Sequence, residues 1–240
     1  MTEHDIAAST SAPRRTALVT GSARRVGRAI AAALIADGWS VLVHARDAGA
    51  AERAARELGA FGWAGADLAD VDGVNHLADA ATITFGDRGL DLLVNSAASF
   101  EQHAEWGAGG ADSWARAFDV NARAPYLLTA ALTGRLSAAR GCVVNVSDRA
   151  AHEHWTSHPL HAASKAALES LTISGAKALA RVGVRVNAVV PRTILPPDDW
   201  TPERIEREAA AGELSSPETL IDAIRALAAD STRTGEIVAL

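Results

Sequence analysis

The chain has 240 residues, 48% of them hydrophobic, which is enough for one large α/β domain and excludes a disordered composition. Its net charge of −6 provides no global attraction to nucleic acid or to an anionic membrane. Cys142 is the only cysteine, so no intrachain disulfide can form, which fits a cytoplasmic protein; we expect Cys142 to be buried in its apolar run CVVNV.

The beginning of the chain, MTEHDIAASTSAPRR, lacks a basic segment followed by an apolar core and is therefore unlike a secretory signal. We expect residues 1–14 to form a flexible polar tail and residues 15–240 to form the folded domain. No apolar run approaches the roughly 18 residues of a membrane span.

Short β-branched runs alternate with segments of helical spacing along residues 15–240. The expected strands are 17–20, 40–45, 61–67, 90–95, 141–147, 184–190 and 236–240. The expected helices are 25–37, 49–59, 71–85, 112–138, 159–181 and 217–229. This order predicts an α/β fold: a single doubly wound (Rossmann) domain with a parallel seven-stranded sheet, helices on both faces, and ligands at the carboxyl ends of the strands.

Two segments without regular periodicity matter for function. The turn GSARRVG follows the first strand, and Gly21 and Gly27 bracket it. Free N–H groups at a helix N-terminus suit a pyrophosphate, although such glycines can also mark a simple turn. Residues 191–216 follow the sixth strand, and we favour a substrate loop there over an inert surface loop.

Motifs along almost the whole chain resemble those of the short-chain dehydrogenases/reductases. TGSARRVG is similar to the family's TGxxxGxG turn, and LLVNSAA (92–98) to its NNAG element. Asn121 matches the structural and catalytic asparagine, and VVNVSD (143–148) matches the fifth strand and its end. HAASKAAL (161–168) resembles the YxxxK helix, and RVNAVVPR (185–192) resembles RVNxxxPG. The resemblance implies an oxidoreductase that uses NAD(P)H.

The residues after the second strand bear on the choice of cofactor. In this architecture an acid there binds the adenosine ribose, whereas a basic residue accepts a 2′-phosphate. Arg46 stands where NADP-using members carry arginine, so the resemblance implies NADP(H), with Asp47 as the contrary signal. The implied cofactor-binding residues are Gly21, Arg24, Arg25, Val26, Gly27, Arg46, Asp67, Leu68, Asn95 and Lys165.

Four features resemble the pteridine reductase and dihydromonapterin reductase branch. Arg25 replaces a glycine of the turn, and VVPRTILPPDD has no glycine after Pro191. Phe100 ends NSAASF, where it would stack on a pterin or else pack a loop. Asp148 stands thirteen residues before His161, in place of the usual catalytic serine, and a carboxylate accepts hydrogen bonds from pterin N–H groups. The implied substrate-binding residues are Arg25, Phe100 and Asp148.

The largest departure is His161, which replaces the family's catalytic tyrosine. His161 and Lys165 are four residues apart and therefore share a helical face. Histidine titrates near neutral pH and can act as an acid or base, while the resemblance implies that Lys165 binds the nicotinamide ribose. The implied catalytic residues are Asp148, His161, Lys165 and Asn121.

Several functions therefore remain open. We favour an NADPH-dependent reductase of a dihydropterin or dihydrofolate. A ketone or 3-oxoacyl reductase is the alternative enzyme, against which the missing serine counts. Another reaction in the same pocket, or a non-catalytic NADP(H)-binding or scaffold protein, would also be compatible with the loss of tyrosine.

The histidine-rich run AHEHWTSHPLH does not have HExxH spacing, so we expect a loop near the site and no metal. The family usually forms dimers and tetramers through helices that correspond to 112–138 and 159–181. We therefore expect a homodimer or homotetramer acting on a small-molecule substrate, with no nucleic-acid or membrane partner. The chain lacks the family's VDGG ending, which often contributes to the tetramer interface.

Overall fold

The computed structural model describes residues 14–103, 105–196 and 200–240, so the expected tail lies outside the described residues except for Arg14. Within these ranges the strands form one sheet in the order β3-β2-β1-β4-β5-β6-β7, and every neighbouring pair is parallel. The strands are β1 (Thr16–Val19), β2 (Ser40–Ala45), β3 (Gly62–Gly65), β4 (Leu92–Asn95), β5 (Cys142–Val146), β6 (Arg185–Val190) and β7 (Ile237–Ala239). The doubly wound fold expected from the sequence is confirmed.

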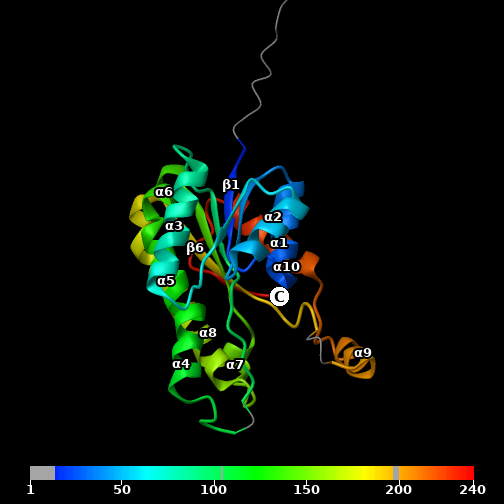
Figure 1. Cartoon of the computed structure of the whole chain (residues 1–240). Helices are drawn as coiled ribbons and strands as arrows, with labels where there is room; N and C mark the ends of the chain where they lie inside the picture. The colour runs from blue at the N-terminus through cyan, green and yellow to red at the C-terminus, as the bar shows by residue number, and fades with distance from the viewer. Residues whose placement is uncertain (1–13, 104, 197–199) are drawn as a thin grey trace, which may run out of the picture.

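Helices cover both faces of the sheet (Figure 1). One layer contains α1 (Arg25–Ala36), α2 (Ala48–Leu58) and α10 (Pro217–Ala229). The other contains α3 (Val71–Phe85), α5 (Ala124–Ala131), α6 (Thr133–Ala139) and α8 (Pro159–Leu179). Three further helices, α4 (Gly110–Phe118), α7 (Ala150–Glu153) and α9 (Pro202–Ala210), lie beyond the carboxyl ends of the strands (Figure 1).

Alternate residues of the strands face the two helical layers, because successive side chains of a strand point to opposite faces. In β1, Ala17 and Val19 join the core beneath α1 and α10, while Leu18 joins the core beneath α3 and α5. Cys142 is fully buried in the first of these cores, as expected. The two cores hold the sheet rigid and fix the positions of the loops at its carboxyl edge.

The expected helix 112–138 is not continuous. It divides into α4, a π-helical turn at Asp119–Arg123, α5 and α6. The helix-forming composition of 112–138 predicts one helix here, because composition does not mark the position of a single extra residue in a π-helical turn. At the junction of α5 and α6, the Thr133 hydroxyl donates to the carbonyl of Thr129 at 2.8 Å. This local hydrogen bond competes with the regular hydrogen bonds of the helix.

The segment 191–216 contains α9, a helix not expected from the sequence. None of the α9 residues is buried, and the helix stands apart from the sheet in Figure 1. The Thr201 hydroxyl caps its first turn by accepting from the Arg204 N–H at 3.3 Å.

None of the helices in the described part of the chain combines the length and the apolarity that crossing a bilayer requires.

Candidate active site

The turn after β1 is shaped by two glycines. Gly21 has φ +67°, and a Cβ there would lie 2.8 Å from the Ala97 Cα. A Cβ on Gly27 would lie 2.4 Å from the carbonyl oxygen of Gly21, so the start of α1 closes directly onto the turn. The α1 N-terminus has no side-chain cap and no acidic residue in its first turn. Its free N–H groups and positive dipole end therefore suit an anion.

Basic side chains surround this turn. Arg24, the residue before α1, and Arg46, the residue after β2, are both exposed. Asp47, the contrary signal for the cofactor, accepts the Ala50 N–H at 2.7 Å and caps α2. This cap uses Oδ1 of Asp47, and the neighbouring Arg46 side chain is exposed at the end of β2, where it can meet a ligand.

Other residues expected to bind the cofactor are used within the protein. The Leu68 side chain is buried in the core, and Asn95 donates to the Asn145 Oδ1 at 2.8 Å across the sheet. The Asp67 carboxylate accepts the Ala69 N–H at 3.0 Å. A cofactor contact of Leu68 would therefore involve backbone atoms, and the role of Asn95 in the described structure is to join β4 to β5.

Arg25 adopts a left-handed backbone conformation with φ +50°, which is unusual for a residue with a Cβ. Its guanidinium donates to the Leu195 carbonyl at 2.7 Å and to the Pro196 carbonyl at 3.4 Å. Arg25 thus connects the turn after β1 to the segment that follows β6.

The pocket at the carboxyl edge of the sheet has a volume of about 730 Å³. His161, Lys165 and Asp148 line its floor, and Phe100 and Arg25 line its walls. The structure therefore brings together the expected catalytic and substrate-binding residues, apart from Asn121, which lies behind His161. Within the described ranges, no group of three or more His, Cys, Asp or Glu side chains is arranged to hold a metal.

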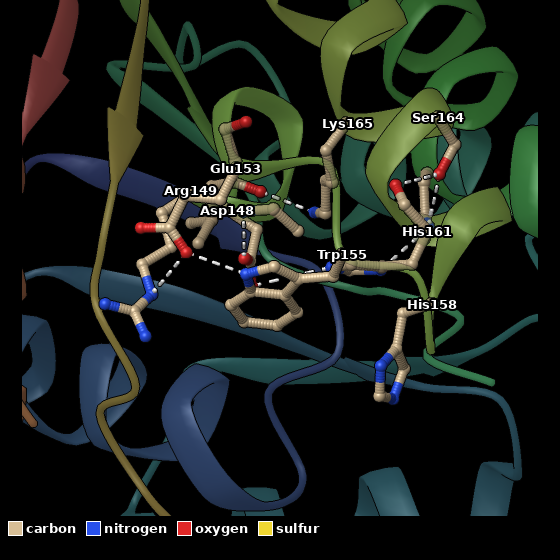
Figure 2. A network of polar contacts seen from close by, with 12 residues as sticks. Asp148, Arg149, Glu153, Trp155, His158, His161, Ser164 and Lys165 are labelled. Atoms are coloured by element: carbon tan, nitrogen blue, oxygen red, sulfur yellow. Dashed lines mark hydrogen bonds and ion pairs between the residues drawn. The ribbon is translucent and has the colours of Figure 1, made fainter. Parts of the chain in front are cut away.

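His161 lies in the first turn of α8 and is only 3% exposed. Its Nδ1 lies 3.1 Å from the carbonyl oxygen of Ser99. The Asn121 Nδ2 lies 3.5 Å from the same atom, so the shorter contact with the carbonyl, which only accepts, favours a hydrogen on Nδ1. Its Nε2 has no hydrogen-bond partner among the described residues and lies 3.5 Å from the Asp148 Oδ2, longer than a good hydrogen bond (Figure 2). One ring nitrogen is thus fixed, while the other faces a carboxylate.

Asp148 follows β5 and accepts the Ala150 N–H at 2.8 Å. Burial raises the pKa of this carboxyl group, but the contact with His161, the bond from Ala150 and the charge of Lys165 together lower the pKa below its ordinary value. Asp148 is therefore ionised at neutral pH and presents an acceptor to the pocket.

Lys165 lies one helical turn beyond His161, and its Nζ donates to the Val146 carbonyl at 2.6 Å (Figure 2). Burial lowers the pKa of the ammonium group to about 8, opposed by the negative charges of Asp148 and Glu169. The group is mostly protonated at pH 7, so the site holds a positive charge next to the Asp148 carboxylate.

Asn121 lies in the π-helical turn and is fully buried. Its Oδ1 accepts the Ser99 N–H at 2.7 Å, and its Nδ2 donates to the Ser99 carbonyl and to the Ser164 hydroxyl, both at 2.9 Å. The Ser164 hydroxyl donates to the His161 carbonyl at 2.8 Å. Asn121 therefore fixes the carbonyl that orients the His161 ring. Ser99 and Ser164 were not expected from the sequence, because their roles depend on contacts between separate elements.

An aromatic wall borders the pocket. Phe100 is 48% exposed, stacks on His158 with ring centroids 4.3 Å apart, and meets the His161 ring edge-on at 4.7 Å. Trp155 meets His158 edge-on at 6.1 Å. Phe100 therefore faces the pocket instead of packing in the core. Trp155 and His158 were not expected as site residues, although both lie in the histidine-rich run.

The segment 191–216 is tied to this wall by charges. Arg149 forms an ion pair with Glu213, and Arg192 lies 3.7 Å from the same carboxylate. Trp200 and Arg204 line the pocket from the beginning of α9. The described parts of this segment, residues 191–196 and 200–216, thus contribute one side of the pocket.

Comparison with known proteins agrees with this geometry. Residues 15–203 match the family model described as short chain dehydrogenase. Galactitol 2-dehydrogenase of Agrobacterium fabrum is 33% identical over 183 residues, 75% of this chain and 70% of the relative. Pteridine reductase 1 of Leishmania tarentolae is 33% identical over 233 residues, covering 79% and 80%. Dihydromonapterin reductase of an Enterobacter species is 31% identical over 188 residues, covering 77% and 76%.

Solved structures show the same architecture. A putative betaketoacyl-ACP reductase superposes with a TM-score of 0.81 at 32% identity, covering 94% of this chain and 95% of that one. L-Sorbose reductase of Gluconobacter frateurii, complexed with NADPH and L-sorbose, superposes with a TM-score of 0.85 at 23% identity, covering 95% of both chains. With its sheet order, its glycine turn and its matched family model, the chain belongs to the short-chain dehydrogenase/reductase family.

Proposed function

We propose that the protein is an NADP(H)-dependent reductase of a small heteroaromatic substrate, with a dihydropterin or dihydrofolate as the first candidate. The observation that carries this proposal is the ionised carboxylate of Asp148 in the pocket lining, with its Oδ2 3.5 Å from the buried Nε2 of His161, which has no hydrogen-bond partner among the described residues. A carboxylate accepts N–H groups, which a pterin ring offers and a simple ketone lacks.

The proposed cofactor site is the turn after β1 together with the end of β2. The tight contact of Gly21 with Gly27 and the uncapped α1 N-terminus suit a pyrophosphate. Arg24 and Arg46 would bind the 2′-phosphate, since both side chains are basic and exposed beside the turn. Lys165 would hold the nicotinamide ribose. NADPH, when bound, would supply a hydride for a C=N bond of the substrate ring.

The proposed substrate site lies between Phe100 and Asp148. A flat heteroaromatic ring gains from stacking on an aromatic side chain, and Phe100 presents about half of its surface. Asp148 would bind the ring N–H and amino groups, while Arg25 and the substrate loop 191–216 would enclose the opposite side. The similarity to a pteridine reductase and a dihydromonapterin reductase supports this substrate class.

In this mechanism His161 delivers the proton that balances the hydride. The Ser99 carbonyl holds Nδ1–H and directs Nε2 toward Asp148 and the pocket. With hydrogen already on Nδ1, a proton on Nε2 makes the ring an imidazolium beside the Asp148 carboxylate. When this proton passes to the substrate nitrogen, the ring returns to the neutral form with hydrogen on Nδ1. Asn121 preserves this orientation by holding the Ser99 backbone on both sides. General acid catalysis of this kind typically contributes about 10²–10⁴-fold.

Reduction of a carbonyl compound is the second candidate. It is favoured by the 33% identity to galactitol 2-dehydrogenase and the 32% identity to the putative betaketoacyl-ACP reductase. The ionised Asp148 opposes it, because a carboxylate without a proton cannot donate to a carbonyl oxygen.

The test is NADPH oxidation, followed at the nicotinamide absorbance band, with dihydropterin, dihydrofolate and a 3-oxoacyl thioester supplied separately. We expect the wild type to turn over a pterin substrate. Asp148→Ser should lower kcat/KM for that substrate by about 100-fold, because one charge-assisted bond pair to the ring is lost. Asp148→Asn should be similarly impaired, since its amide cannot accept at both atoms.

Substrate selectivity separates the candidates. If Asp148→Ser gains activity on the thioester while losing it on pterin, the carboxylate selects for nitrogen heterocycles. Wild-type activity on the thioester alone would instead establish the carbonyl reductase. NADPH binding without turnover of any substrate would indicate a non-catalytic cofactor-binding protein.

A further inference from the structure

A second buried histidine lies beside the cofactor turn. His44, in β2, is 2% exposed. Its Nδ1 accepts the Gly21 N–H at 3.0 Å, and its Nε2 lies 3.0 Å from the Ala66 carbonyl oxygen. Because Gly21 can only donate through its amide and Ala66 can only accept through its carbonyl, the ring is the neutral tautomer with hydrogen on Nε2. The ring thus bridges the turn after β1 and the end of β3.

The backbone of His44 binds the next residue of the same turn. The His44 N–H donates to the Ser22 hydroxyl at 3.0 Å, and the Ser22 N–H donates to the His44 carbonyl at 2.8 Å. The Ser22 hydroxyl in turn donates to the Val19 carbonyl at 2.7 Å. One residue of β2 therefore fixes two consecutive residues of the glycine turn.

The turn has little freedom on its other sides. Gly21 is pressed against the Ala97 backbone, and its carbonyl lies against Gly27 at the beginning of α1. A movement of Gly21 away from His44 would therefore shift the first residues of α1. Those residues carry the free N–H groups that suit a pyrophosphate.

The His44 ring remains neutral in ordinary conditions. Burial lowers the pKa of His44 to about 4, opposed by the bond to the Ala66 carbonyl and by the negative charge of Asp67. At neutral pH the Nδ1 lone pair is therefore available to Gly21.

We propose that His44 is a positioning residue for the pyrophosphate of NADP(H), which it supports by fixing the Gly21 amide and hence the beginning of α1. The inference rests on the NADP(H) binding proposed above. His44 itself does not touch the cofactor and acts through the turn.

Two variants separate the two ring contacts. In His44→Asn, the side-chain oxygen sits near the position of Nδ1 and can still accept the Gly21 N–H. In His44→Gln, the longer amide reaches toward the Ala66 carbonyl, and the acceptor for Gly21 is lost. We expect the Kd for NADPH, measured by calorimetry at pH 7, to rise about tenfold in His44→Gln, because one buried donor is left without a partner. His44→Asn should stay close to wild type.

A second ligand distinguishes positioning from general loss of structure. Adenosine 2′-monophosphate carries the adenine and 2′-phosphate but no pyrophosphate, so its Kd should be equal in wild type, His44→Asn and His44→Gln. Thermal unfolding of each variant, with the exposed His76→Gln as matched control, reports the folded fraction.

Two results would overturn the inference alone: equal NADPH affinity in His44→Gln and wild type, or parallel weakening of NADPH and adenosine 2′-monophosphate. Absence of NADPH binding by the wild type would overturn the proposed cofactor and this inference together. NADPH binding without pterin reduction would overturn only the proposed reaction.

Discussion

His44 and His161 are buried to almost the same extent, 2% and 3% exposed, in two different regions of the sheet edge. In the cofactor turn, both nitrogens of His44 meet backbone groups of fixed polarity. On the pocket floor, only one nitrogen of His161 has such a partner, and the other faces Asp148. The group that faces Nε2 therefore distinguishes the roles of the two histidines. A backbone carbonyl makes histidine a structural support, whereas an ionised carboxylate beside a pocket makes it a candidate proton donor.

Removing the open nitrogen should have the largest effect. We expect His161→Phe to lower kcat for the pterin substrate by about 10²–10⁴-fold, the usual contribution of a general acid, with the Kd for NADPH unchanged. The phenyl ring can keep the edge contact with Phe100, so packing is largely retained. Stopped-flow kinetics and calorimetry would measure the two quantities.

His161→Phe should lower kcat and leave the Kd for NADPH unchanged, whereas His44→Gln should raise that Kd. A His161→Phe enzyme with wild-type kcat would show that the proton comes from another group. His161→Tyr restores the residue type that the family motif carries. An inactive wild type that becomes active with tyrosine would mean that histidine has ended the reductase reaction in this chain.

The next largest effect is the pH dependence of stability that His44 produces. The pKa of His44 is about 4 in the folded protein and 6.5 in the unfolded chain. Between these values the unfolded chain binds the extra proton, so the free energy of unfolding falls as the pH drops from 6.5 toward 4. Backbone groups of the turn and of the β3 end face the ring, and Asp67 is the charged neighbour that acts on it.

The shift corresponds to a loss of about 2 kcal/mol between pH 7 and pH 5. Urea unfolding at the two pH values should show this loss in wild type and a smaller one in His44→Asn, whose amide does not titrate. An identical pH dependence in both proteins would mean that His44 is not kept neutral by its surroundings.

The smallest effect concerns Arg25, which connects the turn after β1 to the segment that follows β6 beside the pocket. Arg25→Gly removes the strain of a left-handed backbone conformation, which should raise the free energy of unfolding by about 1 kcal/mol. The same substitution removes the hydrogen bonds to the Leu195 and Pro196 carbonyls. We expect little net change in the free energy of unfolding and a rise of a few fold in the pterin KM, as for the loss of an exposed hydrogen bond.

Arg25→Asn is the matched variant, because asparagine tolerates this conformation and also lacks the guanidinium. Equal KM values in Arg25→Asn and Arg25→Gly would assign the effect to the guanidinium. A normal KM in both variants would show that Arg25 does not help the substrate loop to enclose the pocket.

Much of this fold could be predicted from the sequence, because strands buried on both faces are nearly continuous apolar runs and the intervening helices keep their own period. The break at Asp119–Arg123 could not, since the residues on both sides and within it are all ordinary helix-compatible types and nothing in the composition marks the π-helical turn. The helix α9 could not either, because it buries no residue and Ile205 is its only large apolar side chain.

The candidate site likewise contains some residues that the sequence could indicate and others that it could not. Asp148, His161 and Lys165 could be identified because they occupy short motifs within a single stretch of chain. The roles of Ser99 and His44 could not, because they arise from pairing with residues of other elements. In the sequence, His44 is one polar residue within an apolar strand, a pattern that also fits a core histidine without a functional role.

The π-helical turn at Asp119–Arg123 sets the angular phase between α4 and α5. Each added residue rotates the next helix by about 100°, so this turn determines which side of α5 meets the sheet. Leu128 enters the core on one side of the turn, while Trp114 on the other remains 54% exposed. The fold therefore constrains the number of residues between Trp114 and Leu128. Loops nearby can grow or shrink, whereas a single deletion here would turn the whole downstream helix out of register with the core.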